Sequence, residues 1–297
     1  MTLTLAGECD ETLGAMATSS INLSPGEIAR VAQLLPVAPR LMVELGQALH
    51  DPHVDSDEVI ALLRQDPSLV AQIIRMANSA AYAPPEPVGS IERALASVGF
   101  VEAHRMAGAV AARQLAGWNF RLYPFNGNQL QQNALYVAVV MEELARETGE
   151  SSRSCYTVGL LRTVGMMMLE RLAGPGAAIP PFATSGEAVL DVWEQAYWGT
   201  TNVEVAEQVL LRWRLPHETV TAIRHHYRPA NRHNPILHLL TLSASSASDR
   251  FFGLPGEESY WTPKGENFSK AGLTEQKYLR ACERAQRTFD RLTSASA

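Results

Sequence analysis

Residues 66–80 read DPSLVAQIIRMANSA, and this stretch has the features of one complete α-helix. Pro67 suits a first helical turn, because the N–H that proline lacks would have no helical partner there. Apolar side chains then recur at the spacing that places them on one face of a helix. Asn78 and Ser79 can satisfy the terminal carbonyls and begin the following turn. The stretch therefore predicts an amphipathic helix with a defined start and end.

The same helix signals recur on both sides of this stretch. A capping residue precedes glutamate by three positions, as in a capping box, at Ser24–Glu27, Asp55–Glu58 and Thr201–Glu204. Leu215-Pro216 repeats the proline start, and glycines stand where helices should end, at Gly99, Gly117 and Gly149. The alternation of apolar and polar residues that is typical of strands is nearly absent. The predicted fold class is all-α.

Changes in composition divide the chain into three parts. Residues 1–22 are small and polar and are expected to form a disordered tail. Residues 23–249 are expected to form the main domain, with an N-terminal lobe over 23–118 and a second lobe over 128–249. Residues 250–297 form an extension, in which a loop precedes an amphipathic helix from about 274 to 292. We expect the apolar side of this helix to fold back on the domain, with docking of a partner as the alternative. That side contains Tyr278, Leu279, Cys282, Ala285, Phe289 and Leu292.

Composition excludes several classes of protein. With 46% apolar residues and a net charge of −6, the whole chain cannot be disordered, and 25 basic against 31 acidic residues make nucleic acid an unexpected partner. No apolar run approaches the ~20 residues that a membrane span requires. The amino terminus lacks the pattern of a secretory signal, and three distant cysteines predict neither disulfides nor structural zinc. We expect a cytoplasmic protein that contacts no membrane.

Several segments, read together, resemble the HDOD domain, a bacterial signalling module related to HD-type metal phosphohydrolases. The matching segments are Leu34 to Pro39, Asp66 to Leu69, Arg75 to Tyr82, Ser90 to Gly99, Gly159 to Gly165, Glu204 to Ala206, Arg212-Trp213, Leu215-Pro216 and Ile223 to His226. The resemblance implies an HD-like helical bundle of two packed lobes. It also implies that the signature residues are structural, and these are Asp66, Pro67, Asn78 and Ser79.

The resemblance also shows where the metal chemistry of the enzymes would lie. The enzymes read GLLHDIGK where this chain reads GLLRTVGM, so that Arg162 and Thr163 replace the histidine and aspartate that bind metal. Arginine offers a metal no lone pair and stays protonated, and a neutral hydroxyl is a poor bridging ligand. The positions compared with the enzymes' ligands are Asn133, Arg162, Thr163, Asn202, His226 and Thr241, of which His226 alone keeps a ligand type. The comparison implies that the chain has no catalytic residues, no metal and no cofactor.

The predicted function is non-catalytic regulation of signalling through contacts with other signalling proteins. One alternative is a residual phosphohydrolase or cyclic-dinucleotide phosphodiesterase that uses His225, His226 and His238. Another is a nucleotide-sensing module without hydrolysis, because an arginine side chain can form two parallel hydrogen bonds to the oxygens of a phosphate. The candidate anion-binding residues for such a module are Arg212, Arg224, His225, His226 and Arg228. The sequence names neither the partner nor the signal.

Overall fold

The computed structural model describes residues 24–296 except 33–36, 50, 52–53, 175, 177, 185–188, 230–232 and 262–264. The predicted tail over 1–22 and residues 34–36 of the first matching segment lie outside the described residues. Within them the chain is helical and contains no strand, so the all-α prediction is confirmed. No helix in this part of the chain is both long and apolar enough to cross a bilayer.

The described residues form fourteen α-helices and one 3-10 helix. The segment predicted as the N-terminal lobe contains α1 (Pro25–Ala32), α2 (Val37–Ala48), α3 (Ser56–Leu63), α4 (Pro67–Ala77) and α5 (Ile91–Leu115), of which α1 packs on α8 and α10. The segment predicted as the second lobe contains α6 (Gly127–Thr148), α7 (Ser152–Leu161), α8 (Val164–Ala173), α9 (Leu190–Trp198), α10 (Asn202–Arg212), α11 (His217–His225) and α12 (Pro235–Asp249). The extension adds η1 (Glu258–Tyr260), α13 (Gly265–Lys270) and α14 (Glu275–Ser296).

The predicted capping residues lie at the observed helix starts. At α4, Asp66 Oδ1 accepts a hydrogen bond of 3.1 Å from the backbone N–H of Leu69. Ser24 and Glu27 form a complete capping box at α1, in which each side chain bonds the backbone N–H of the other residue. At α10 the backbone N–H of Thr201 donates to Glu204, which supplies one half of such a box. Local hydrogen bonding therefore explains why these segments begin as helices where they do.

Two predicted boundaries differ from the observed ones. Gly99 breaks α5 without ending it, because its φ of +79° is open to glycine and the helix resumes on the far side. The second lobe, expected from residue 128, begins one residue earlier, since Asn126 and Gln129 form a capping box that starts α6 at Gly127. A Cβ at Gly127 would lie 2.4 Å from the carbonyl oxygen of Leu115, so a glycine permits this close approach.

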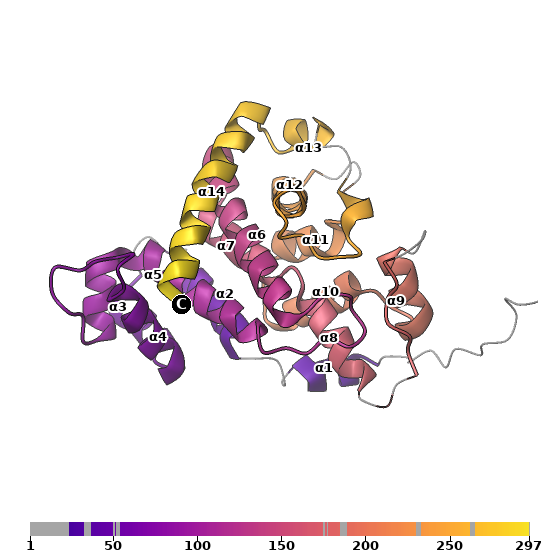
Figure 1. The fold of residues 1–297 in the computed structure, drawn as a ribbon, viewed down its shortest axis with the longest axis horizontal. Coiled ribbons are helices and arrows are strands. Elements are labelled where there is room, and N and C mark those ends of the chain that lie inside the picture. The colour runs from indigo at the N-terminus through magenta and orange to yellow at the C-terminus, as the bar shows by residue number, and fades with distance from the viewer. Residues whose placement is uncertain are drawn as a thin grey trace, which may run out of the picture.

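Helix α6 is the centre of the molecule. Its side chains are buried over most of its length, and α5, α7, α12 and α14 all pack against it. Helices α2 and α4 pack on α5, whereas α8 and α11 pack on α10. Figure 1 shows α3 and α4 at one end of the molecule and α9 at the other, with α6 and α7 between them. The core is therefore shared by both lobes.

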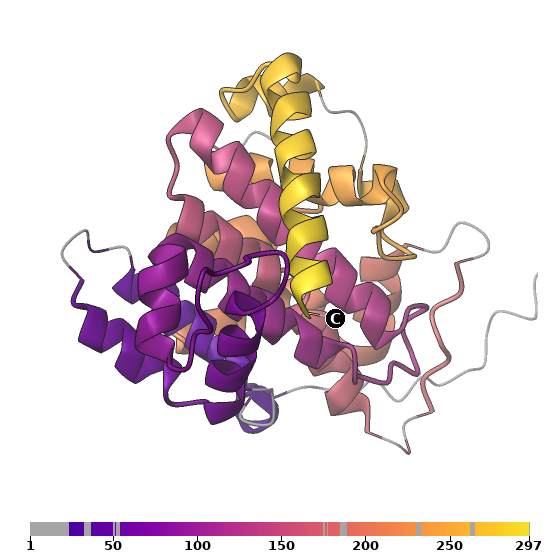
Figure 2. The ribbon, with the colours of Figure 1, turned by 60° about the vertical axis from the view of Figure 1, so that its left-hand side comes forward.

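The C-terminal helix α14 folds back on the domain, as expected. Its contacts are with α4, α5 and α6, and Figure 2 shows it running over the surface of the helices beneath it. Its buried face contains Tyr278, Ala281, Cys282, Ala285, Phe289 and Leu292. Leu279, expected on the same side, is 52% exposed. Consecutive residues of a helix are turned by about 100°, and the buried face of α14 is too narrow to include both Tyr278 and Leu279.

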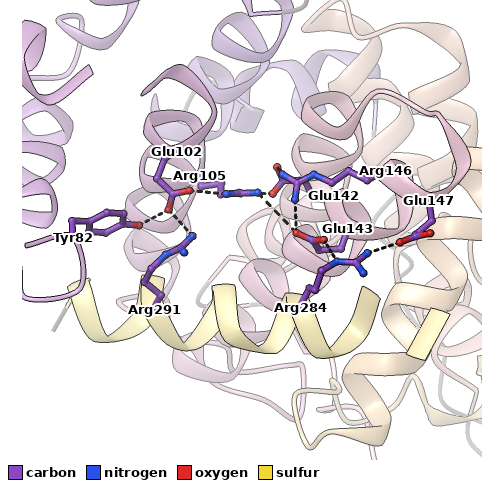
Figure 3. A network of polar contacts seen from close by, with 9 residues as sticks. All are labelled: Tyr82, Glu102, Arg105, Glu142, Glu143, Arg146, Glu147, Arg284 and Arg291. Carbon is purple, nitrogen blue, oxygen red and sulfur yellow. Dashed lines mark hydrogen bonds and ion pairs between the residues drawn. The ribbon is translucent and has the colours of Figure 1, made fainter. Parts of the chain in front are cut away.

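A chain of ion pairs fastens α14 to both lobes (Figure 3). Arg291 contacts Glu102 of α5 at 2.9 Å, and Arg284 contacts Glu143 of α6 at 2.8 Å. Between them, Arg105 of α5 pairs with Glu102 and with Glu142 of α6. Burial opposes ionisation of Glu102, but hydrogen bonds from Tyr82 and Arg105, with the charges of Arg105 and Arg291, keep its pKa below the usual 4.5. The network thus joins α5, α6 and α14, with mostly buried charges on α5 and α6 and half-buried arginines on α14.

Asn78 clamps the end of α4 to the chain ahead of α5. Its Nδ2 donates to the carbonyls of Ile74 (2.9 Å) and Val88 (2.8 Å), and its Oδ1 accepts from the N–H of Val88. We expect Asn78→Ala to lower the free energy of unfolding by about 2–3 kcal/mol, because backbone groups lose their partners. Urea denaturation measures this change. The control is Gln72→Ala on the same helix, where one exposed bond to Ser68 is lost. An equal loss in both variants would refute the clamp.

Candidate functional site

Four residues from distant parts of the chain meet at the position that the family resemblance compares with the metal site of HD enzymes. Arg162, between α7 and α8, is 1% exposed. Its Nη1 donates to Glu257 Oε1 at 2.6 Å, and its Nη2 donates to Asn133 Oδ1 of α6. The same Nη1 lies 3.3 Å from His226 Nε2 at the end of α11. A guanidinium cation therefore occupies the centre of the site, with a carboxylate, an amide and an imidazole around it.

His226 is neutral and faces Arg162 with a lone pair. Its Nδ1 lies 2.8 Å from the carbonyl oxygen of Ile223, which can only accept, so Nδ1 holds the proton and Nε2 is free to accept from Arg162. Burial and the nearby Arg162 charge lower the His226 pKa to about 3. Thr241 of α12 supports the arrangement by donating to the backbone carbonyl of His226 at 3.0 Å.

Glu257, the counter-ion of Arg162, comes from the extension. Its Oε1 also accepts a 2.6 Å hydrogen bond from the hydroxyl of Tyr227. The Trp261 ring lies 5.8 Å from the guanidinium carbon of Arg162, and Tyr260 stacks on Tyr227 at 4.3 Å. Glu257 was not among the site residues predicted from the sequence. One signal in the sequence could have indicated it. Glu257 lies among glycine, proline and aromatic residues, and an arginine buried in the core requires a negatively charged partner.

Another buried carboxyl group belongs to Glu194. Glu194 of α9 accepts hydrogen bonds from the hydroxyl of Tyr123 (2.7 Å), and from the backbone N–H (2.7 Å) and side-chain amide of Asn202. Burial raises the pKa of Glu194 to about 7 against the opposing effect of these hydrogen bonds. Asn202 thus belongs to the Glu194 group, whereas Asn133 and His226 contact Arg162. Thr163 is buried ahead of α8 and makes no capping bond there.

The residues proposed for anion binding have other contacts. Arg224 pairs with Glu204 (2.7 Å) and Glu207, and Arg228 pairs with Asp191 (2.7 Å). Arg212 is exposed at the end of α10, His225 is half-buried at the end of α11, and His226 faces inward to Arg162. Acidic side chains on α9 and α10 thus contact two of the arginines that the sequence grouped together. The anion site stays a prediction.

The side chains at this position do not fit the dinuclear centre of HD enzymes. Two bridged divalent ions require several histidines and carboxylates, but here one imidazole is hydrogen-bonded at both nitrogens and the carboxylate is bonded to a guanidinium. Within the described residues, no three or more His, Cys, Asp or Glu side chains are grouped in a way that could hold a metal ion. The histidines of the alternative enzymatic hypothesis have separate partners, since His238 Nδ1 lies 2.9 Å from Asn267 Oδ1.

A sequence model of the HDOD domain matches residues 35–229. This chain belongs to the HDOD domain family. The HDOD protein also resembles an uncharacterized protein of Treponema pallidum (strain Nichols), with 24% identity over 233 residues. That match covers 76% of this chain, and the chain spans only 44% of the Treponema protein.

Three solved structures resemble the HDOD protein in fold. An HDOD domain protein of unknown function from Geobacter sulfurreducens is 20% identical, with a TM-score of 0.65 and coverage of 91% of this chain and 96% of that one. A Shewanella amazonensis SB2B protein, provisionally named a phosphohydrolase, is 20% identical, with a TM-score of 0.63 and coverage of 91% and 98%. A Marinobacter aquaeolei VT8 protein, provisionally named a signal transduction protein, is 22% identical, with a TM-score of 0.67 and coverage of 88% and 58%. These likenesses confirm the predicted HDOD fold.

Proposed function

We propose that this HDOD protein is a non-catalytic regulator of bacterial signalling in the cytoplasm, and that it acts through contacts with other proteins. The observation that carries the proposal is the buried pair of Arg162 with Glu257. A permanent cation stands where the enzymes bind divalent ions, and it would repel them. The names of the structural neighbours include both a phosphohydrolase and a signal transduction protein. The chemistry of this site favours the second class.

The pair also explains how the fold can persist without a metal. In HD enzymes the ions bind ligands from several helices together. Here Arg162 contacts Asn133 of α6, His226 beside α11 and Glu257 after α12. One guanidinium therefore links the same parts of the bundle by hydrogen bonds and charge, and the lobe is kept as a scaffold for contacts.

The test measures metal content and turnover on one sample. Full-length protein is purified from cells supplied with manganese, iron and zinc, analysed for metals, and incubated with bis-p-nitrophenyl phosphate and with cyclic dinucleotides. The proposal expects far less than one metal per chain and no turnover. Near-stoichiometric metal, or turnover that is lost in His226→Ala and kept in His217→Ala, would favour the residual phosphohydrolase. His217 is the control because it is exposed on the same helix.

Phe251 supports a role in protein contacts. Its side chain is 98% exposed, and its φ of +65° is a conformation that phenylalanine rarely adopts. The residue thus contributes strain and almost no burial to the folded chain. We expect Phe251→Gly to raise the free energy of unfolding by about 1 kcal/mol and to reduce capture of cellular partners.

The matched control for Phe251 is Arg214→Gly, because Arg214 is also exposed and has a φ of +59°. This variant should gain similar stability and keep partner capture, as measured by urea denaturation and by quantitative pull-down from the native cell. If both variants capture partners equally well, Phe251 is not a contact residue.

The nucleotide-sensing alternative has its own measurement. Calorimetric titration with cyclic dinucleotides should give no heat if the protein is an adaptor only. Binding that is lost in Arg224→Ala would favour the sensor instead. The Glu204 and Glu207 contacts of Arg224 weigh against it, because a phosphate would have to compete with two carboxylates already in place.

A further inference from the structure

A pocket of about 490 Å³ lies between α2 of the first lobe and α7, α11 and α12 of the second. Its volume is within the range of small-molecule sites. One wall is apolar and is formed by Val43, Leu215, Pro216 and Ile236. The pocket shares no lining residue with the Arg162–Glu257 pair, and its lining comes from both lobes.

The polar lining of this pocket presents hydrogen-bond acceptors. The hydroxyl of Thr157 donates a hydrogen bond to the carbonyl of Arg153 (3.1 Å), so the lone pairs of the hydroxyl oxygen are available to accept one from a ligand. The side-chain NH2 of Gln47 donates a hydrogen bond to the carbonyl of Arg214 (3.2 Å), so Gln47 Oε1 is available to accept one from a ligand. Glu150, which is half-buried, and Glu218, which is exposed, add two carboxylates to the lining. No lysine, arginine or histidine belongs to the lining.

An imidazole nitrogen without a hydrogen-bond partner lies beside this lining. His104 is 2% exposed, and its Nε2 makes no hydrogen bond within the described part of the chain. A Cβ added at Gly46 would lie 3.1 Å from Thr157 Oγ1 and 3.8 Å from His104 Nε2. Burial, with the charges of Arg153 and Arg105, lowers the His104 pKa to about 3, so the imidazole itself adds no positive charge beside the pocket. The Arg153 guanidinium donates to the carbonyl of Leu49 and lies outside the lining.

We propose that this interlobe pocket binds a small organic cation: an amine with an apolar body. The apolar wall would cover the body, and the carboxylates of Glu150 and Glu218 would attract the ammonium group, which can also donate to Thr157 or Gln47. An anionic nucleotide is disfavoured, because the lining offers its phosphates no basic partner. Since α2 and α11 belong to different lobes, an occupant would contact both lobes at once. The proposal goes beyond the adaptor function and does not depend on it.

The test is calorimetric titration of the full chain with three probes that share an indole ring. Tryptamine is cationic, 3-methylindole is neutral and indole-3-acetate is anionic. We expect tryptamine to bind tightest and indole-3-acetate weakest. The double variant Glu150→Gln with Glu218→Gln should weaken tryptamine binding about tenfold, as expected for the loss of one half-buried and one exposed charge contact, and leave 3-methylindole binding unchanged.

Two further variants separate this site from non-specific attraction and from unfolding. Glu275→Gln with Glu283→Gln removes the same charge from exposed positions on α14 and should not change binding. Gly46→Ala adds a methyl group toward Thr157 and His104 and should weaken binding of both tryptamine and 3-methylindole, and thermal unfolding of the variant checks that it is folded at the temperature of the titration. Failure of tryptamine to bind at millimolar concentration, tighter binding of indole-3-acetate, or an equal loss in the α14 control would each overturn the proposal.

Discussion

Glu257→Ala is expected to lower the free energy of unfolding by about 3–5 kcal/mol, a large share of the stability of an ordinary domain. The carboxylate is 1% exposed and is the ion-pair partner of Arg162, which is equally buried. Its removal leaves a guanidinium that cannot lose its proton and has no access to water. The hydroxyl of Tyr227 loses its acceptor at the same time. Urea denaturation followed by tryptophan fluorescence measures the loss, since Trp261 lies beside the pair.

A double variant shows whether the loss arises from the unpaired charge. In Arg162→Met with Glu257→Leu both charges are removed and similar volume is kept, so most of the stability should return. Asn133 Oδ1 and the hydroxyl of Tyr227 would still lack their partners, which makes recovery incomplete. Glu266→Ala is the control for an exposed ion pair with Lys270 and should change stability little. If Glu257→Ala costs no more than Glu266→Ala, the buried pair does not hold the site together.

The fold could be predicted from the sequence because its signals are local. Asp66-Pro67 and the Ser24–Glu27 box act within one turn of a helix, and each lies where the corresponding helix starts. The width of a buried stripe depends on what packs against it, and for this reason Leu279 was misplaced. Residue spacing alone could not show that α14 would cover α5 and α6.

The candidate site was predictable only in part, for the same physical reason. The family resemblance brought Asn133, Arg162 and His226 to one position, and the structure places them in contact. Glu257 and Glu194 were missed because a carboxylate in a loop or on an amphipathic helix is usually solvated, and only tertiary packing buries it. The choice of Arg224 as an anion-binding candidate likewise took no account of Glu204, which is 20 residues away in sequence and 2.7 Å away in space.

Glu194 should make the free energy of unfolding fall as pH rises, whereas the buried histidines of the protein should make it rise. Its pKa rises from 4.5 to about 7 on folding, because burial disfavours the charged form. Between these values the folded chain keeps a proton that the unfolded chain releases. The free energy of unfolding should therefore fall as pH rises from about 4.5 to about 7, by about 3 kcal/mol in all.

His226 and His104 give the contrary slope over part of the same range. Their pKa values fall from 6.5 to about 3 on folding, so their contribution is complete above pH 6.5 and is lost as pH falls toward 3. The wild-type profile is the sum of both effects, and the difference between wild type and Glu194→Gln isolates the carboxyl group. Glutamine stays neutral at every pH and has a similar size.

Urea denaturation of wild type and Glu194→Gln at intervals from pH 4.5 to 8 measures that difference. The variant should be the less stable protein at pH 4.5, where its amide NH2 faces donors from Tyr123 and Asn202. The free energy of unfolding of the variant should rise relative to that of wild type up to about pH 7, and the difference between them should then stay constant. Asp191 lies close enough to raise the same pKa, so Asp191→Asn should move the midpoint of the difference to lower pH. A difference that does not vary with pH would mean that Glu194 is charged in the folded chain throughout, and that Tyr123 and Asn202 stabilise a buried carboxylate with no cation beside it.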